Sequence, residues 1–253
     1  MPNRADSPAI ADLRARIARL EGDGAHPHEV LPFGIAPLDR KLPGGGLALG
    51  CLHEVAGGGN GAVDGAAAAC FTAGIAARTT GQVLWCVALQ DLFAPGLAQA
   101  GLPPGRVIFV EAGDDKAVLA CMEEGLRHGG LGEVVGDIAR LPMTASRRLH
   151  LAAKGSATIC IALRRWRRQA EASDFGQPTA AMTRWRISAL PSSSLPVPGV
   201  GRPRWLVELI RARAGECLDI ELEACDGSGH LCLPAELADR PVAAEGGRRS
   251  AAR

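Results

Sequence analysis

The chain has 253 residues, of which 47% are hydrophobic and 22% are charged, and its formal net charge is +1. This length and composition exclude a disordered chain and suit one large α/β domain, alone or with an appendage. The small net charge argues neither for nor against nucleic acid as a partner. Charge is uneven along the chain, because residues 147–213 are strongly basic and both flanking segments are acidic.

The cysteines never occur at C-x-x-C spacing and most lie in apolar runs, which predicts buried thiols in a cytosolic protein. The amino-terminal residues lack the apolar core of a signal peptide, and no stretch reaches the roughly 18 apolar residues of a membrane span. We therefore expect a cytoplasmic protein without a membrane partner. The spacing of His and Cys residues predicts no metal site.

An amphipathic helix is predicted near the amino terminus, where Ile10, Leu13, Ile17 and Leu20 recur at helical spacing. Its apolar stripe either docks on a neighbouring subunit or covers the chain's own sheet. A linker containing His and Pro follows this helix. We expect residues 1–30 to form the helix and linker, 31–240 the core, and 241–253 a disordered tail.

Buried strands alternate with helices through the core. Strands are predicted at 51–56, 82–89, 106–112, 132–138 and 157–163, with helices at 65–78, 93–102, 116–129 and 144–156. This alternation predicts an α/β fold with a mostly parallel sheet that is covered by helices on both faces. Residues 204–234 are predicted to add an antiparallel extension at the carboxyl-terminal end.

A glycine-rich turn follows the first of these strands, at the place of a phosphate-binding loop. A working loop has the pattern G-x-x-x-x-G-K-[ST], in which lysine neutralises phosphate charge and the hydroxyl binds Mg²⁺. Valine replaces the lysine here and aspartate replaces the hydroxyl residue, so we expect neither tight ATP binding nor another cofactor. The corresponding residues are Gly57, Gly58, Gly59, Asn60, Gly61, Ala62, Val63 and Asp64.

The segment from Phe33 to Ala69 resembles the start of the RecA core, in which G-x-x-x-L-D and a glycine-rich turn precede the ATP-binding strand. More specifically, the chain is similar to the ImuA family from about residue 31 to 233. The TASRRL and LPVPG stretches are specific, whereas the glycine-rich pieces are weak alone. The matching stretches are LPFGIAPLDRKLPGGGLALGCLHEVAG at 31–57, VGD at 135–137, LPMTASRRLHLAA at 141–153, RWR at 184–186, LPVPG at 195–199 and EACDG at 223–227.

The resemblance implies a RecA-like fold and a non-catalytic accessory role in damage-induced, error-prone translesion DNA synthesis. It implies as partners the Y-family polymerase-like protein ImuB, an error-prone replicative-type polymerase reached through ImuB, and RecA as a further candidate. RecA-like ATPases carry a catalytic glutamate where this chain has Gln90, which cannot accept a proton from water. Asp137 matches the Walker B aspartate and is expected to be vestigial, with a structural role such as a helix cap.

The segment LRRWRRQ at 163–169 places four arginines around one tryptophan, directly after a predicted strand. Such a pattern suits single-stranded DNA, since guanidinium groups pair with phosphates and an indole stacks on a base. In the RecA fold the loop after this strand contacts DNA, so the resemblance favours the same interpretation. Docking on an acidic protein and a solvated helix end are the alternatives. The candidate binding residues are Arg164, Arg165, Trp166, Arg167, Arg168, Arg184 and Arg186.

Two further functions stay open at this point. One is a weak nucleotide-binding ATPase of RecA type that draws a lysine from elsewhere in the chain, such as Lys41 or Lys154. The other is a cell-division inhibitor resembling SulA, which only a distant kinship with RecA-like inhibitors suggests.

Overall fold

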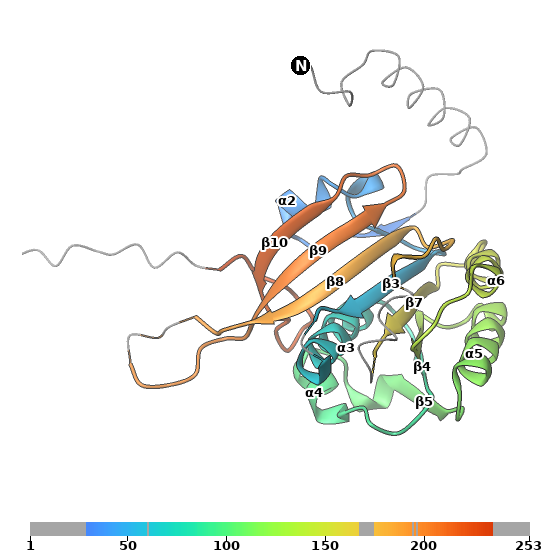
Figure 1. The fold of residues 1–253 in the computed structure, drawn as a ribbon, viewed down its shortest axis with the longest axis horizontal. Coiled ribbons are helices and arrows are strands. Elements are labelled where there is room, and N and C mark those ends of the chain that lie inside the picture. The colour runs from blue at the N-terminus through green and yellow to red at the C-terminus, as the bar shows by residue number, and fades with distance from the viewer. Residues whose placement is uncertain (1–28, 60, 167–174, 194, 196, 235–253) are drawn as a thin grey trace, which may run out of the picture.

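A computed structural model describes residues 29–59, 61–166, 175–193, 195 and 197–234 (Figure 1). The predicted amino-terminal helix and the predicted tail at 241–253 lie outside these residues. The division of the chain into helix, core and tail therefore stays a prediction.

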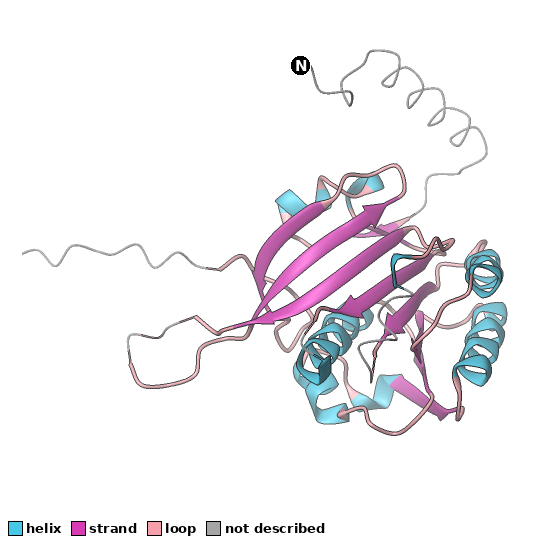
Figure 2. Cartoon of the chain, viewed as in Figure 1, coloured by secondary structure: helices cyan, strands magenta, loops and turns pink. Residues whose placement is uncertain are grey.

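The described residues form two sheets and the helices that cover the larger one (Figure 2). The strands are β1 (Val30–Leu31), β2 (Leu47–Ala48), β3 (Leu52–Gly57), β4 (Val83–Val87), β5 (Val107–Glu111), β6 (Glu133–Ile138), β7 (Ile159–Arg164), β8 (Thr183–Leu190), β9 (Arg204–Ala212) and β10 (Leu218–Glu223). The helices are α2 (Ala36–Asp39), α3 (Gly61–Arg78), α4 (Ala94–Gln99), α5 (Asp115–His128) and α6 (Met143–Ala153), with short 3-10 turns at Pro43–Gly45 and Pro104–Arg106.

The larger sheet has eight strands in the order β10-β9-β8-β3-β7-β6-β4-β5. Its strands from β8 to β5 run parallel, and β9 and β10 extend it antiparallel beyond β8. The smaller sheet pairs β1 with β2 antiparallel, next to α2. The predicted fold class is confirmed, namely a mostly parallel sheet with helices on both faces and an antiparallel carboxyl-terminal extension.

Helix α3 covers one face of the sheet and can approach it closely because most of its residues are small. Its Phe71 packs with Phe33 and Trp185, with ring centroids 5.9 and 5.8 Å away. At Gly74 a Cβ atom would lie 2.2 Å from the Cys225 Sγ, so the chain after β10 also packs directly on this helix. These contacts join the parallel strands and the antiparallel extension into one core.

Helices α5 and α6 cover the opposite face and form a second apolar cluster with β4, β6 and β7. Helix α5 begins at the Asp114 cap, whose carboxylate accepts the Ala117 N–H at 2.7 Å, and it ends at Gly129 in the left-handed conformation. Met122 lies over Gly136 of β6, where a Cβ atom would come within 2.0 Å of the Met122 Sδ.

This arrangement brings the carboxyl ends of the parallel strands to one edge of the sheet, where open α/β sheets bind their ligands. The loops after β3, β4, β6 and β7 therefore lie next to one another although they are far apart in sequence. None of the helices in the described part of the chain has the length and apolar character needed to cross a membrane.

Candidate functional site

A cavity of about 720 Å³ lies at the carboxyl ends of β4, β6 and β7. One wall is the first turns of α3, where Gly61, Gly65 and Ala69 leave room. The opposite wall is the loop after β4, with Leu92 and Phe93. This volume suits a small ligand or a few side chains of a partner protein.

The glycine-rich loop after β3 packs against the end of β8. Its Gly58 N–H donates to the Ile187 carbonyl at 2.9 Å. A Cβ atom on Gly58 would lie 2.1 Å from the Ser188 Oγ and 2.7 Å from the Asp64 Oδ2. At Gly58 the loop is thus closely packed against protein atoms, and this N–H points at a carbonyl of the chain itself, whereas a working loop directs such groups at phosphate.

Asp64, at the position of the Mg²⁺-binding hydroxyl, joins α3 to β8. The residue is only 2% exposed, and its Oδ1 accepts the Ala189 N–H at 2.9 Å. Val63, at the lysine position, is 54% exposed. Asn60 lies outside the described residues. The position that would contact phosphate is therefore a solvent-facing valine, and the position that would contact magnesium is a buried structural carboxylate.

Asp137, which matches the Walker B aspartate, forms an ion pair with Arg165 beside the cavity. The Arg165 Nε donates to the Asp137 Oδ2 at 2.6 Å, and its Nη2 donates to the Asp91 Oδ1 at 2.5 Å. Burial lowers the pKa of Arg165, but the hydrogen bonds and charges of Asp137 and Asp91 outweigh this effect, so the pKa lies above its ordinary value. The permanent positive charge of Arg165 therefore lies next to Asp137, at the position of the aspartate that orients Mg²⁺ in an ATPase.

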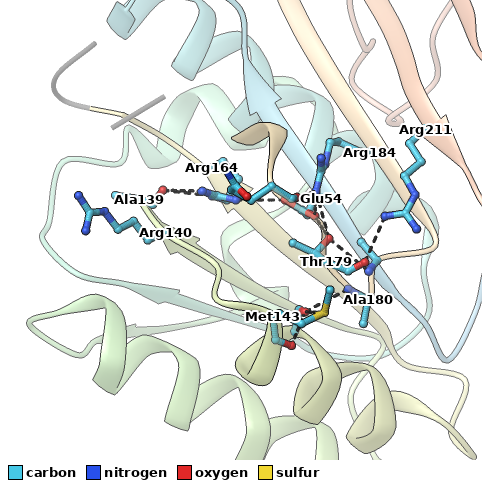
Figure 3. A network of polar contacts seen from close by, with 12 residues as sticks. Glu54, Ala139, Arg140, Met143, Arg164, Thr179, Ala180, Arg184 and Arg211 are labelled. Carbon is cyan, nitrogen blue, oxygen red and sulfur yellow. Dashed lines mark hydrogen bonds and ion pairs between the residues drawn. The ribbon is translucent and has the colours of Figure 1, made fainter. Parts of the chain in front are cut away.

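A buried carboxylate lies between two buried arginines at the centre of the sheet (Figure 3). Glu54 of β3 accepts from the Arg164 Nη1 at 3.1 Å and from the Arg184 Nη2 at 2.9 Å. The side chains of Glu54 and Arg164 are fully buried, and that of Arg184 is 7% exposed. Because buried charges are tolerated when they are paired, this triad ties β3 to its neighbours β7 and β8.

Further hydrogen bonds extend this triad to the chain between β7 and β8 and to the loop after β6 (Figure 3). The Thr179 hydroxyl donates to the Glu54 carboxylate, and the Arg211 Nη1 donates to the Thr179 carbonyl at 3.1 Å. The Arg164 Nη2 donates to the Ala139 carbonyl at 2.8 Å. The network therefore holds the described residues at both ends of the β7–β8 connection against the central strands of the sheet.

Trp166 packs on the same connection, with its ring centroid 5.3 Å from that of Phe175. Its Nε1 donates to the Ala139 carbonyl at 3.3 Å, and the residue is half-buried. The indole therefore contributes to the packing beside the cavity, and a base could stack only on the part that stays exposed.

The structure corrects the predicted binding role of Arg164 and Arg184. Both guanidinium groups are buried on Glu54, so neither is presented to a nucleic acid or an acidic partner. The sequence does contain a sign of this, because a carboxylate within the buried run LHEVAG needs a cation nearby. Sequence reasoning missed both this pairing and the contact of Asp91 with Arg165.

The remaining predicted binding residues have different surroundings. Arg186 has a side chain that is 45% exposed and donates to the Glu208 carboxylate at 2.7 Å. Arg165 faces the cavity, and Arg167 and Arg168 lie outside the described residues. A binding role for these four arginines and for Trp166 stays a prediction.

Comparison with known proteins gave the following matches. No protein-family model matches the chain. Protein ImuA of Caulobacter vibrioides strain NA1000 / CB15N is 38% identical over 245 residues, which cover 91% of this chain and 99% of that protein, and Protein ImuA of a second strain of this species matches equally. Among solved structures, the RadB recombinase has a TM-score of 0.55 at 17% identity and covers 81% of this chain and 100% of its own, a likeness that shows a RecA-like fold.

The variant Glu54→Gln tests the buried triad. It leaves two buried guanidinium groups without their counter-charge, so the free energy of unfolding should fall by about 3–5 kcal/mol. Urea unfolding followed by tryptophan fluorescence measures this change. The matched control Glu216→Gln breaks a pair with Lys41 in which the Glu216 side chain is 72% exposed, and it should cost less than about 1 kcal/mol. Equal losses in the two variants would contradict the role assigned to Glu54.

Proposed function

This chain belongs to the ImuA family, and we propose that it is a non-catalytic accessory protein of damage-induced, error-prone translesion DNA synthesis. It acts by binding polymerase-like partners and turns over no nucleotide. The observation that carries this proposal is the altered phosphate loop, in which Asp64 bonds to β8 while Arg165 pairs with Asp137.

Two features of the loop argue against nucleotide turnover. Loss of the lysine removes a charge-assisted contact worth about 1.5–3 kcal/mol, and a buried aspartate adds negative charge next to the place of a triphosphate. Gln90, in place of the catalytic glutamate, cannot act as a base for the attacking water.

Two of the chain's three lysines, Lys41 and Lys154, are badly placed to rescue the loop. Lys41 forms an ion pair with Glu216 in the turn between β9 and β10, at the edge where the parallel strands begin. Lys154 follows α6 shortly before β7 starts, at the same edge. Both residues therefore lie at the edge where the parallel strands begin, whereas the loop lies at the opposite edge, where β3 ends. This placement argues against a weak ATPase that uses Lys41 or Lys154.

ATP turnover should stay at the background rate with Mg²⁺ present, because the contacts that bind and polarise the triphosphate are missing. Phosphate release by the purified chain measures this rate, and Asp137→Ala should give the same value. A competent RecA-type ATPase serves as the positive control. Turnover above background that disappears in Asp137→Ala would contradict the non-catalytic proposal.

Partner binding is the second half of the proposal. Membership of the ImuA family supports an ImuB-type polymerase-like subunit as the direct partner, through which an error-prone replicative-type polymerase would be reached, and RecA is a further candidate. We expect the purified chain to co-elute with the ImuB-type subunit of its own cassette in size-exclusion chromatography. An unrelated Y-family polymerase should elute separately from it. Separate elution of the cassette's own pair would count against the accessory role.

Direct contact with single-stranded DNA is a further expectation for the residues that follow β7. Since Arg164 is buried on Glu54, the informative variant is Arg167→Ala/Arg168→Ala. Fluorescence anisotropy of labelled single-stranded DNA should show binding that weakens with salt and is lost in this variant. The control Arg147→Ala/Arg213→Ala removes two exposed arginines elsewhere and should bind normally. Equal binding by both double variants would exclude this contact.

A further inference from the structure

We propose that the cavity at the carboxyl ends of β4, β6 and β7 binds a segment of a partner protein in which Lys or Arg stands next to aromatic or aliphatic residues. The inference rests on the partner-binding function proposed above and assigns it a place on the molecule. A basic, apolar peptide is the occupant, in the position where a RecA-like ATPase would hold its nucleotide.

The charge of the cavity favours a cation over a phosphate. Carboxylates of Asp91, Asp115 and Asp137 line it, against the single guanidinium of Arg165. Among the described residues that line the cavity no other cationic side chain occurs, so the formal balance is three negative charges against one positive charge. A negative, partly enclosed surface attracts cations and repels a polyphosphate.

Two of these carboxylates are placed where a cation in the cavity would meet them. The Asp91 side chain is 48% exposed even though it contacts Arg165. The Asp115 Oδ2 accepts the N–H groups of Ala139 and Arg140 at 3.1 and 3.0 Å, which holds this carboxylate at the cavity wall. Each ionised carboxylate offers about four lone-pair positions, so Asp115 can still accept from a Lys or Arg of the partner, and the exposed part of Asp91 adds negative charge at the same cavity.

The rim of the cavity is apolar. Phe93 is 70% exposed and Leu89 is 45% exposed, and both belong to the loop after β4 that forms one wall. Leu92 and the small residues of α3 continue this apolar surface inward. Large exposed apolar side chains around a cavity are typical of protein contact sites. Because the apolar surface continues past the cavity mouth, it fits a peptide that crosses the rim better than a ligand that is enclosed.

The arrangement of the carboxylates does not suit a metal ion as the cation. In the part of the chain that the structure describes, no group of three or more His, Cys, Asp or Glu side chains is placed to hold one. A Lys or Arg side chain needs only one or two of these carboxylates, and the aliphatic part of its chain packs on apolar walls.

Selection of a random-peptide display library on the immobilised full-length chain tests this proposal. We expect enrichment of peptides that combine Lys or Arg with aromatic or aliphatic residues. A synthetic peptide with the enriched consensus sequence is then titrated by fluorescence anisotropy. Replacing its basic residues by Glu should weaken binding by at least about tenfold.

Two variants and two matched controls assign the peptide to the cavity. Asp91→Asn removes an accessible carboxylate, and Phe93→Ser removes an exposed ring; each should weaken binding of the consensus peptide about tenfold. Asp219→Asn and Val200→Ser change an exposed carboxylate on β10 and an exposed valine in the β8–β9 loop, and both should bind like the unaltered chain. No enrichment, enrichment of acidic peptides, or equal binding by all four variants would overturn the proposal.

Co-elution with the ImuB-type subunit separates failure of this site from failure of the proposed function. If that subunit binds the unaltered chain, Asp91→Asn and Phe93→Ser equally well, the cavity assignment is wrong and the accessory function stands. If the subunit binds none of them while the consensus peptide still distinguishes the cavity variants from the controls, the peptide site stands and the proposed partner is wrong.

Discussion

One negative charge, that of Glu54, holds the centre of the sheet together. The strand register places Arg184 of β8 directly opposite Glu54, while Arg164 reaches it from the end of β7 on the other side. Two buried guanidinium groups share one carboxylate, and the carbonyl oxygens of Ala139 and Gln177 accept further hydrogen bonds from Arg164 and Arg184, respectively. Two parts of the cavity lining, the start of α3 and the residues after β7, follow β3 and β7, so the geometry of the site depends in part on this pairing.

The glycine-rich loop lies where a phosphate-binding loop lies in a RecA-like fold, but its described hydrogen bonds go to other parts of the chain. In a working loop the backbone N–H groups and the residues after the last glycine face the nucleotide. Here Gly58 and Asp64 bond to β8, and Arg165 compensates the charge of Asp137. The Gly58 N–H and the Asp64 carboxylate therefore stabilise the junction of β3, α3 and β8.

The fold could be predicted because its signals are local. Apolar runs of strand length alternate with helices, and the missing lysine and hydroxyl are visible at single positions. The site could be predicted only in part, because its contacts join residues that are distant in sequence, such as Glu54 with an arginine 110 positions away. Four arginines in one short segment indicate a basic surface, but Arg164 is the last residue of β7 and Arg165 directly follows it, and successive residues of an extended chain point to opposite sides. Arg164 therefore turns into the core while Arg165 turns to the cavity, and composition alone does not distinguish the two.

This difference between adjacent arginines has a consequence for genetics. An allele that changes Arg164 acts on the amount of folded protein in the cell, because it leaves Glu54 short of a counter-ion inside the sheet. An allele that changes Arg165 acts at the surface of the cavity and leaves the buried triad intact. In a complementation screen of the LRRWRR segment, equal loss of mutagenesis at these two codons would thus have different causes, and the cellular abundance of each variant would tell them apart.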